Sequence, residues 1–540
     1  MKIILTLAIA LTLTAAADAF GGSAAWKRTP ADGDWNNPAN WLGDGPPNGA
    51  SDVATFNFSR VTDLFLSAPT TLDSLVFGHQ AGTDWTVTAP TGTEFSFVGA
   101  GIDNGRFSYE YFISDASGGP GGGFVFSNNA SCGGFDIFTN RGATGAGESG
   151  GFVKFLDNSQ DSSGTVSVVI NEGGIVSGAG GGFAELRGTA NPNSTSFLNH
   201  AGVVGASGGS TSLYDNATGG SMTADGAPAP GAGAGSIHYY DSSSGGALTA
   251  NGGSNGGDGG LIEIRDDCPG GFGVMSVNGN GVIDLSNHNP AVPVTTADFA
   301  GDGSVVLGSS NLVIGPLDPS FNYFYGVISD GGKGGSLTFS DSGIALMVFT
   351  GANTYTGGTT IDGGSLFILK NPNGSGTGRG PVNVHRGILG GTGVIGGTLT
   401  VGDGSSAAAY LTPGPEEVSP EGGGIGVFTI QKRVTFKSNG IYEFQISSKL
   451  GKADKLNAKG LSIESGATIA CFDRGTQISP PGTRYFVINN TSQSAIAGTF
   501  SNLPDGGTIQ IGTNTYQANY EGGDGNDLTL TVVRELRRRE

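Results

Sequence analysis

The amino-acid sequence predicts an all-β protein built as a parallel β-solenoid, and three observations lead to this fold class. Glycine accounts for 100 of the 540 residues, which is about 19% against a usual share of roughly 7%. Between the glycines stand short runs in which apolar and polar residues alternate, as they do in β-strands. A unit of about 25 to 31 residues also recurs, and a unit of that size buries its apolar side only by stacking on its neighbours.

The composition excludes several other classes. The glycines follow no Gly-X-Y period and proline contributes only 23 residues, so a collagen helix is excluded. Charged residues make up 13% and hydrophobic residues 37%, which indicates a folded chain rather than a disordered one. The net charge of −20 argues against nucleic-acid partners and is compatible with calcium. Three cysteines far apart in the sequence allow at most one disulfide, so stability must come from packing.

Residues 1–19 have the features of a secretory signal peptide. Lys2 supplies the positive charge, an apolar stretch follows, and Ala17-Asp18-Ala19 is a small-x-small cleavage site. The alternative, a membrane anchor, would need about 20 apolar residues and a stop-transfer flank. We therefore expect a secreted, extracellular or cell-surface protein whose mature chain has no transmembrane segment.

Residues 20–120 are predicted to form a Trp-rich cap and the first coils. All four tryptophans, Trp26, Trp35, Trp41 and Trp85, lie in this part of the chain. A β-solenoid has an open end whose unpaired edge invites aggregation, and bulky aromatic residues would cover it. The alternative is that exposed indole rings stack on sugars.

Residues 121–350 are predicted to be glycine-rich solenoid repeats. Residues 211–226 and 237–252 are identical at seven of sixteen positions at an offset of 26, and a third copy begins at Leu261. Short alternating runs separated by glycine clusters predict strands joined at corners where glycine adopts positive φ.

The same repeats place three aspartates in register. Asp215, Asp241 and Asp266 recur at offsets of 26 and 25 residues, so they should stack on successive coils. The preferred interpretation is that each carboxylate caps a turn by accepting hydrogen bonds from backbone amides. The alternative is a calcium-binding ladder, because Ca²⁺ prefers carboxylate and carbonyl oxygens. No other cofactor is expected.

Residues 351–401 carry the most distinctive motif of the chain. GANTYTGGTTI at 351–361 resembles the autotransporter-associated β-strand repeat, also called the passenger-associated transport repeat. GGTGVIGGTLTV at 390–401, the LTPG step at 411–414 and the stretch 33–56 are similar to family members as well. The resemblance implies a bacterial, right-handed single-stranded parallel β-helix of the pectin lyase-like kind, carried to the cell surface, with no catalytic residues.

The last part of the chain departs from an autotransporter. Residues 402–533 contain too little alternation for a C-terminal membrane β-barrel, so we expect further coils and a β-rich closing region. Residues 534–540 form a basic tail. The motif GGDGND at 522–527 resembles one turn of a calcium-binding nonapeptide repeat, but a single copy favours a hairpin turn.

Catalytic patterns are sparse in this sequence. Cleavage of a polysaccharide needs two carboxylates about 5–10 Å apart, and the adjacent acidic pairs are Asp266-Asp267 at a repeat corner and Glu416-Glu417 in a Pro-rich loop. The five histidines have no short metal-binding spacing. We therefore predict a non-enzymatic, exported structural or adhesive surface protein whose partners are surface glycans or other cell-surface components. The alternatives are a polysaccharide-active β-helix enzyme and a carbohydrate-binding secreted protein.

Overall fold

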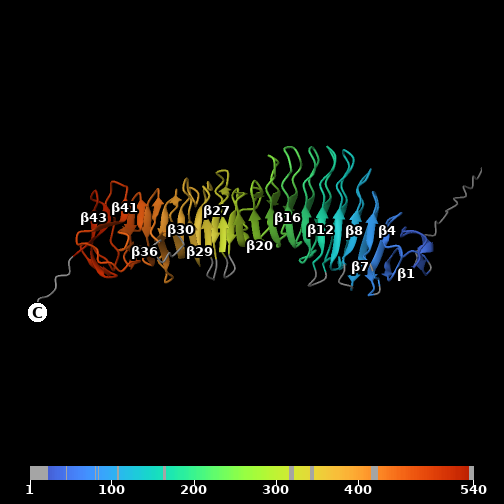
Figure 1. Cartoon of the computed structure of the whole chain (residues 1–540), viewed down its shortest axis with the longest axis horizontal. Coiled ribbons are helices and arrows are strands. Elements are labelled where there is room, and N and C mark those ends of the chain that lie inside the picture. Colours follow the sequence, from blue (N-terminus) through green and yellow to red (C-terminus); the bar gives the residue numbers. More distant parts are fainter. Residues whose placement is uncertain are drawn as a thin grey trace, which may run out of the picture.

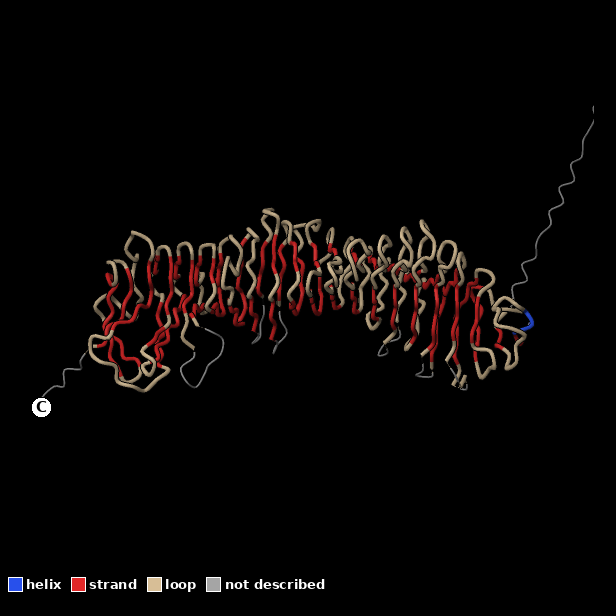
Figure 2. Tube along the Cα trace, turned by 45° about the horizontal axis from the view of Figure 1, so that its top comes forward, coloured by secondary structure: helices blue, strands red, loops and turns tan. Residues whose placement is uncertain are grey.

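The computed structural model describes residues 22–43, 45–79, 81–82, 84–105, 109–161, 166–315, 321–340, 346–414 and 424–533. The predicted signal peptide, the Glu416-Glu417 pair and the basic tail lie outside these residues. The chain forms an elongated rod in which successive coils follow one another from one end to the other (Figure 1). Strands run across the rod, and the one short helix of the described residues, the 3₁₀ turn η1 (Pro38–Asn40), lies near the N-terminal end (Figure 2). The predicted all-β solenoid is confirmed.

Three sheets make up the walls of the rod. The first contains, in order, β2 (Trp41–Leu42), β1 (Ala24–Trp26), β3 (Gly49–Phe56), β5 (Thr70–Phe77), β7 (Glu94–Asn104), β9 (Gly123–Phe126), β11 (Phe152–Phe155), β13 (Phe183–Leu186), β15 (Ser210–Leu213), β17 (Ser236–Tyr239), β19 (Leu261–Ile264), β21 (Val282–Asp284), β23 (Ser304–Val306) and β26 (Val327–Ser329). The second contains β4 (Asp63–Phe65), β6 (Thr86–Ala89), β8 (Glu110–Ser114), β10 (Asp136–Asn140), β12 (Val168–Asn171), β14 (Ser196–Asn199), β16 (Ser221–Ala224), β18 (Ala247–Ala250), β20 (Gly270–Val277), β22 (Val294–Gly301), β24 (Asn311–Ile314), β25 (Phe321–Phe324), β27 (Ser336–Phe339), β28 (Leu346–Phe349), β29 (Gly358–Leu369), β30 (Val382–Gly391), β32 (Leu399–Val401), β33 (Ala409–Pro413), β35 (Val434–Phe436), β36 (Gly440–Ser447), β37 (Lys452–Ala453), β39 (Leu461–Ile463) and β40 (Thr468–Asp473). The third, at the C-terminal end, contains β31 (Val394–Ile395), β34 (Val427–Ile430), β38 (Lys455–Ala458), β41 (Arg484–Asn490), β44 (Asp527–Val532), β43 (Asn514–Gly522) and β42 (Thr508–Ile511).

The central strands share one burial pattern. β11, β13, β15, β17 and β19 each have half-buried residues at their first and third positions and fully buried residues at their second and fourth. This is the two-residue period expected of strands with one face toward the core. The outward face of these strands is the part of the rod that displays side chains for contact.

The coil length matches the sequence repeat. Leu213 of β15 pairs in parallel with Tyr239 of β17, and Tyr239 pairs with Ile264 of β19, at offsets of 26 and 25 residues. The predicted stacking of the repeats is therefore confirmed. Because every coil pairs with the coil before and after it, a side chain at one position recurs at the strand spacing of about 4.8 Å on the next coil.

Aromatic rings fill the core between the first two sheets. Phe97, Phe126 and Phe155, from β7, β9 and β11, stack with ring centroids 4.9 and 5.4 Å apart. Phe138 of β10 packs edge-on against Phe126 at 5.7 Å, which joins the two sheets. Such pairs stabilise the fold beyond the apolar area they bury.

A row of buried asparagines connects three coils at the ends of β10, β12 and β14. Asn140 Nδ2 donates to Asn171 Oδ1 at 2.7 Å, and Asn171 Nδ2 donates to Asn199 Oδ1 at 2.8 Å. All three side chains are fully buried. Since a buried amide without partners would be costly, the row supplies partners to the Nδ2 groups of Asn140 and Asn171 and to the Oδ1 atoms of Asn171 and Asn199.

Glycine is required at the corners for two different reasons. Gly246 has a φ of +93°, a conformation that L-residues rarely adopt. At Gly181, by contrast, a Cβ would lie 2.0 Å from the carbonyl oxygen of Gly208 on the next coil. Close approach between coils is therefore a second cause of the high glycine content, beside the positive φ that the sequence predicts.

The stretch 351–369 differs in detail from its prediction. Its glycine pairs predict corners at Gly357-Gly358 and Gly363-Gly364, with strands at 359–361 and 365–368. Instead, one strand, β29, spans Gly358–Leu369. The predicted corner at Gly363-Gly364 is a bend inside this strand, because its pairing register with β30 shifts between Asp362 and Leu366. β29 pairs with both β27 and β28, so it contributes to two neighbouring faces of the same coil.

The two ends of the rod are closed differently. At the N-terminal end, Trp26 and Trp35 pack on Trp41 with centroids 5.0 and 4.8 Å apart. All four tryptophans are buried, with exposures of 3% or less. At the C-terminal end, β41, β44, β43 and β42 pair antiparallel, and β43 and β44 form a hairpin around residues 523–526. The hairpin interpretation of the GGDGND motif is confirmed.

Candidate functional site

The predicted aspartate ladder lies at an exposed corner of the rod, after β15, β17 and β19. Asp215, Asp241 and Asp266 are exposed and have φ values of 58°, 54° and 51°. Asp241 Oδ2 accepts a hydrogen bond from the Asp215 amide at 3.0 Å, and Asp266 Oδ2 accepts one from the Asp241 amide at 3.3 Å. Each carboxylate therefore caps the backbone of the coil before it, as the turn interpretation expects.

The calcium alternative stays a prediction. Across the described ranges, no group of three or more His, Cys, Asp or Glu side chains is arranged to hold a metal ion. One oxygen of each aspartate in the ladder is engaged by an amide, and Asp215 Oδ2 accepts from the Gly188 amide at 2.9 Å. The second oxygen of each is the group that a calcium ion would have to recruit.

A column of arginine and tyrosine side chains runs beside the ladder. Arg187, Tyr214, Tyr240 and Arg265 each precede the corner residue of their coil, so strand pairing places them next to one another. The Tyr214 and Tyr240 rings are parallel, with centroids 4.8 Å apart. Arg187 Cζ lies 3.9 Å from the Tyr214 centroid and Arg265 Cζ lies 5.6 Å from the Tyr240 centroid. We call these four residues the Arg–Tyr column.

The geometry of the Arg–Tyr column limits what it can bind. Each tyrosine ring has its neighbour on one face and a guanidinium group on the other, so neither face is free for a sugar ring. The ring edges and hydroxyl groups are the surfaces that a partner could contact. Cation–π contacts of this kind also hold the long arginine side chains in place, which reduces the entropy lost on binding.

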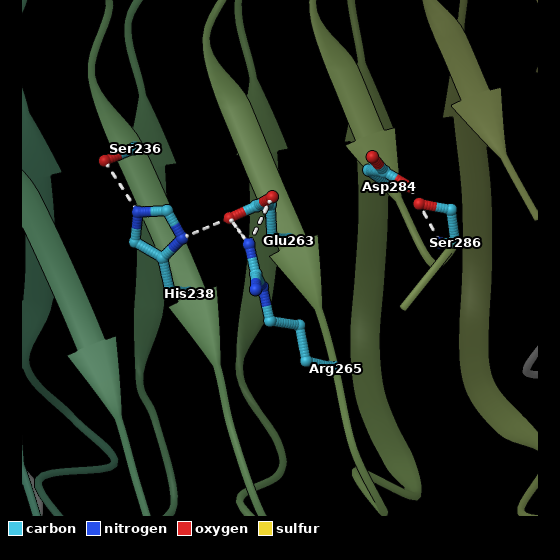
Figure 3. Close-up of polar contacts among 6 residues, drawn as sticks. All are labelled: Ser236, His238, Glu263, Arg265, Asp284 and Ser286. Atoms are coloured by element: carbon cyan, nitrogen blue, oxygen red, sulfur yellow. Dashed lines mark hydrogen bonds and ion pairs between the residues drawn. The ribbon is translucent and has the colours of Figure 1, made fainter. Parts of the chain in front are cut away.

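A polar cluster lies on the same outward face, two residues before the Arg–Tyr column along each strand (Figure 3). His238 Nδ1 lies 2.8 Å from Glu263 Oε2, and His238 Nε2 lies 3.0 Å from Ser236 Oγ. Arg265 donates to both Glu263 oxygens at 2.7 and 2.8 Å. The nearby Asp284 Oδ1 accepts from the Ser286 amide at 2.7 Å, which is a local turn contact.

The electrostatics of this cluster favour a neutral histidine. Partial burial lowers the pKa of His238, and the Glu263 charge opposes this only in part. Burial also acts to raise the pKa of Glu263, but hydrogen bonds and charges from Arg265 and His238 bring it below its usual value. A carboxylate only accepts, so the neutral ring donates from Nδ1 and its Nε2 accepts from the Ser236 hydroxyl.

The contacts Ser–His–Glu follow the order of a nucleophile, a general base and an orienting carboxylate. Ser236 and His238 lie two residues apart on one strand, and Glu263 lies opposite His238 on the next. However, Arg265 occupies both oxygens of Glu263. The cluster therefore has the side-chain types and contacts of a hydrolytic site, but its carboxylate is held by an arginine, as in a surface ion-pair network.

The other predicted candidates are not brought together. His200 pairs with Asp225 at 2.7 Å on the second sheet, and His288 is held by the Cys268 carbonyl at 2.8 Å. Asp267, the second member of the acidic pair, accepts from Asn289 Nδ2 at 2.7 Å. The cysteines Cys132, Cys268 and Cys471 are free.

The interpretation of the tryptophans as exposed sugar-stacking rings is wrong, because all four are buried in the N-terminal core. Sequence reasoning also missed the Arg–Tyr column. Its signal was present in the repeat, where an arginine or tyrosine occupies the position before the corner residue in four consecutive units. The repeat alignment singled out the identical aspartates and passed over the variable residue beside them.

Comparison with known proteins leaves the family open. No family model matches the chain, and no curated protein matches it. Among solved structures, the chain is similar to the Haemophilus influenzae Hap adhesin, at 11% sequence identity over 92% of this chain and a TM-score of 0.22. The chain spans 66% of the length of that adhesin chain. The β-solenoid agrees with what the resemblance to the autotransporter-associated repeat implies, and membership in that family stays a prediction.

Among the helices of the described residues, none has the length and apolar character needed to cross a membrane.

Proposed function

We propose that the protein is an exported structural or adhesive surface protein whose contact face is the outward side of β13, β15, β17 and β19. The observation that carries this proposal is the Arg–Tyr column. It displays two stacked tyrosines between two arginines on four consecutive coils. Tyrosine and arginine are the residue types that dominate binding surfaces.

The rod supports adhesion through rigidity. Each strand of this face pairs with a strand on either side, so the displayed side chains keep a fixed spacing. A preordered face loses less conformational entropy when a partner binds. A flat, regularly spaced surface suits a large partner such as a surface glycan or another cell-surface component.

The proposal is tested by binding of the purified mature chain to a glycan array and to intact cells. The variant Tyr214→Ser/Tyr240→Ser removes the centre of the column, and Tyr325→Ser removes an exposed tyrosine between β25 and β26 as a control. We expect the double variant to lose binding by about tenfold or more, as for a residue pair at a binding hot spot. Equal binding by both variants would contradict the assignment of this face.

A hydrolytic function is the second candidate, and the Ser236–His238–Glu263 contacts are the observation that favours it. The same array, monitored for cleavage products and ester hydrolysis, separates the two functions. If the face is adhesive, Ser236→Ala leaves binding unchanged and no product forms with either protein. Product formation that Ser236→Ala abolishes would establish the enzyme instead.

A further inference from the structure

Positive charge is concentrated in residues 424–490 of this acidic protein. Residues 424–490 contain nine Lys or Arg residues and only four Asp or Glu residues, whereas the whole chain has 26 and 46. This stretch builds three of the seven strands of the third sheet, β34, β38 and β41. A basic region within a chain of net charge −20 creates a local field that attracts anions.

The outward face of β34 and β38 displays part of this charge. Lys455 and Asn457 point outward from β38, because Leu456 and Ala458 between them are buried. Lys459 follows at the end of the same strand and is exposed. Lys459 lies four positions after Lys455, which corresponds to about 13 Å of extended chain.

Polar groups lie between the positive charges. Asn489 Nδ2 of β41 donates to Asn457 Oδ1 at 3.0 Å, and Asn457 Nδ2 donates to Thr429 Oγ1 of β34 at 3.3 Å. The row crosses three neighbouring strands at the middle of the face. Amide and hydroxyl groups of this kind form hydrogen bonds with hydroxyl groups of a ligand.

A cavity lies at each end of this face. The cavity before β34 and β38 has a volume of about 430 Å³, and its lining includes Lys452, Lys455, Arg484 and the half-exposed Phe486. The cavity beyond the other end of β34 has a volume of about 360 Å³. Its lining includes Arg379, Gln431, Lys432, Asn353 and Ser375.

Neither the cations of the two cavities nor Lys459 forms an ion pair with an acidic side chain of the described residues. Within the described ranges no ion pair involves Arg379, Lys432, Lys452, Lys455, Lys459 or Arg484, whereas Lys437 of the same region pairs with Glu464 at 2.6 Å. Asp454 lies between Lys452 and Lys455 in sequence, but it is buried and accepts from the amides of Gly426 and Gln445. Burial raises the pKa of Asp454 to about 8, so this carboxyl group is mainly protonated and uncharged at neutral pH.

We propose that this face binds an acidic polysaccharide, which lies across β34, β38 and β41 from one cavity to the other. Its carboxylate or sulfate groups would contact the cations at each end, and its hydroxyl groups would contact Thr429, Asn457 and Asn489. A glycan fits better than single-stranded nucleic acid, which needs several aromatic stacking platforms, whereas Phe486 is the exposed aromatic ring lining these cavities. This inference is independent of the Arg–Tyr column and extends the proposed function to a second site.

The test measures binding of polygalacturonate to the purified mature chain by titration at low and at moderate salt. One variant, Lys452→Gln/Lys455→Gln/Arg484→Gln, removes the positive charges that line the first cavity. A second variant, Arg379→Gln/Lys432→Gln, removes those that line the other cavity. The control Lys437→Gln/Lys449→Gln removes two charges of the same region outside both cavities. We expect each cavity variant to weaken binding by about tenfold or more, with a smaller salt dependence, and the control to stay within about twofold.

Competing ligands distinguish the alternatives. Neutral dextran should not bind, and inorganic phosphate should displace polygalacturonate only at concentrations far above those of the polymer. If the control variant lost as much affinity for polygalacturonate as the cavity variants, the binding would reflect net charge alone. If single-stranded DNA bound more tightly than polygalacturonate, the face would be assigned to nucleic acid. Either result overturns the proposal. Tyr214→Ser/Tyr240→Ser should bind polygalacturonate normally, so failure of the Arg–Tyr column as an adhesive face would leave this result intact.

Discussion

Phe155 and Phe152 allow a direct test of which face of the first sheet contributes more to the free energy of unfolding. Both lie on β11, three residues apart, and they point to opposite faces of the sheet. Phe155 is fully buried, stacks on Phe126 at 5.4 Å and contacts Phe197 edge-on at 6.2 Å. Phe152 is half-buried and stacks on Phe183 at 5.6 Å, outside the core.

The two substitutions should have different costs. Phe155→Ala removes a fully buried ring, for which the free energy of unfolding falls by about 3–5 kcal/mol, including the cavity left behind. Phe152→Ala removes a cross-strand pair on the outward face, which contributes about 1 kcal/mol. The difference arises because the space left by Phe155 cannot be filled by water, whereas the space left by Phe152 is open to solvent.

Guanidinium unfolding followed by circular dichroism gives the midpoints of wild type and both variants. Long repeat proteins can unfold in parts, so hydrogen exchange of the amides of β9, β11 and β13 provides the local free energies. We expect slow exchange on these strands to be lost in Phe155→Ala and largely kept in Phe152→Ala. Equal destabilisation, or a larger effect of Phe152→Ala, would refute the assignment of inward and outward faces.

Three further predictions concern polar groups. Asp241→Asn should change the free energy of unfolding by only a few tenths of a kcal/mol, because the new amide oxygen can still accept from the Asp215 amide, whereas Asp241→Ala should lower it by about 1–2 kcal/mol. Thermal melts of the wild type with calcium and with a chelator should coincide. A calcium-dependent shift that is lost in Asp241→Asn would support the metal ladder instead. Asn171→Ala should cost about 1–3 kcal/mol, because it interrupts the buried row of amides, and the exposed Asn158→Ala serves as its control in the same unfolding assay. Burial raises the pKa of Asp454 to about 8, above its unfolded value of about 3.9, so the folded protein holds this proton more tightly than the unfolded chain. The resulting stabilisation is complete below pH 4 and is lost as the pH rises toward 8. The free energy of unfolding falls by about 1.4 kcal/mol per pH unit at most. Unfolding midpoints at pH 5 and pH 8 should show the wild type losing stability relative to Asp454→Asn, and parallel profiles would contradict this.

The repeats made the main features of the rod predictable. The offsets of 26 and 25 residues set the coil length, and two-residue alternation set the inward and outward faces of each strand. The aspartate corner was equally accessible, because identical residues at one register position must stack when coils stack. The bend at Gly363-Gly364 was harder to assign, since a glycine pair is compatible with both a corner and a shift of register within one strand.

The candidate sites were less accessible because their members are dissimilar or distant. The Arg–Tyr column mixes two residue types, so identity between repeats does not reveal it, although the stacked rings and guanidinium groups form one surface. In the C-terminal region, Arg379 and Lys432 line one cavity despite the 50 or so residues of chain between them. Only the stacking of coils brings them to the same place.

The sequence by itself determined that this protein winds as a solenoid, because glycine content, strand alternation and repeat length depend on local chain geometry and on the need of each coil to bury its apolar side. The tertiary structure alone decided which side chains meet across coils, such as His238 with Glu263 or Asn457 with Thr429 and Asn489. The physical reason is that each coil has its own length, with pairing offsets that range from 17 residues for Val382 and Leu399 to 35 for Leu399 and Val434, so lateral contacts depend on the pairing register of every strand. That register is set by the packed core as a whole and cannot be read from any one repeat.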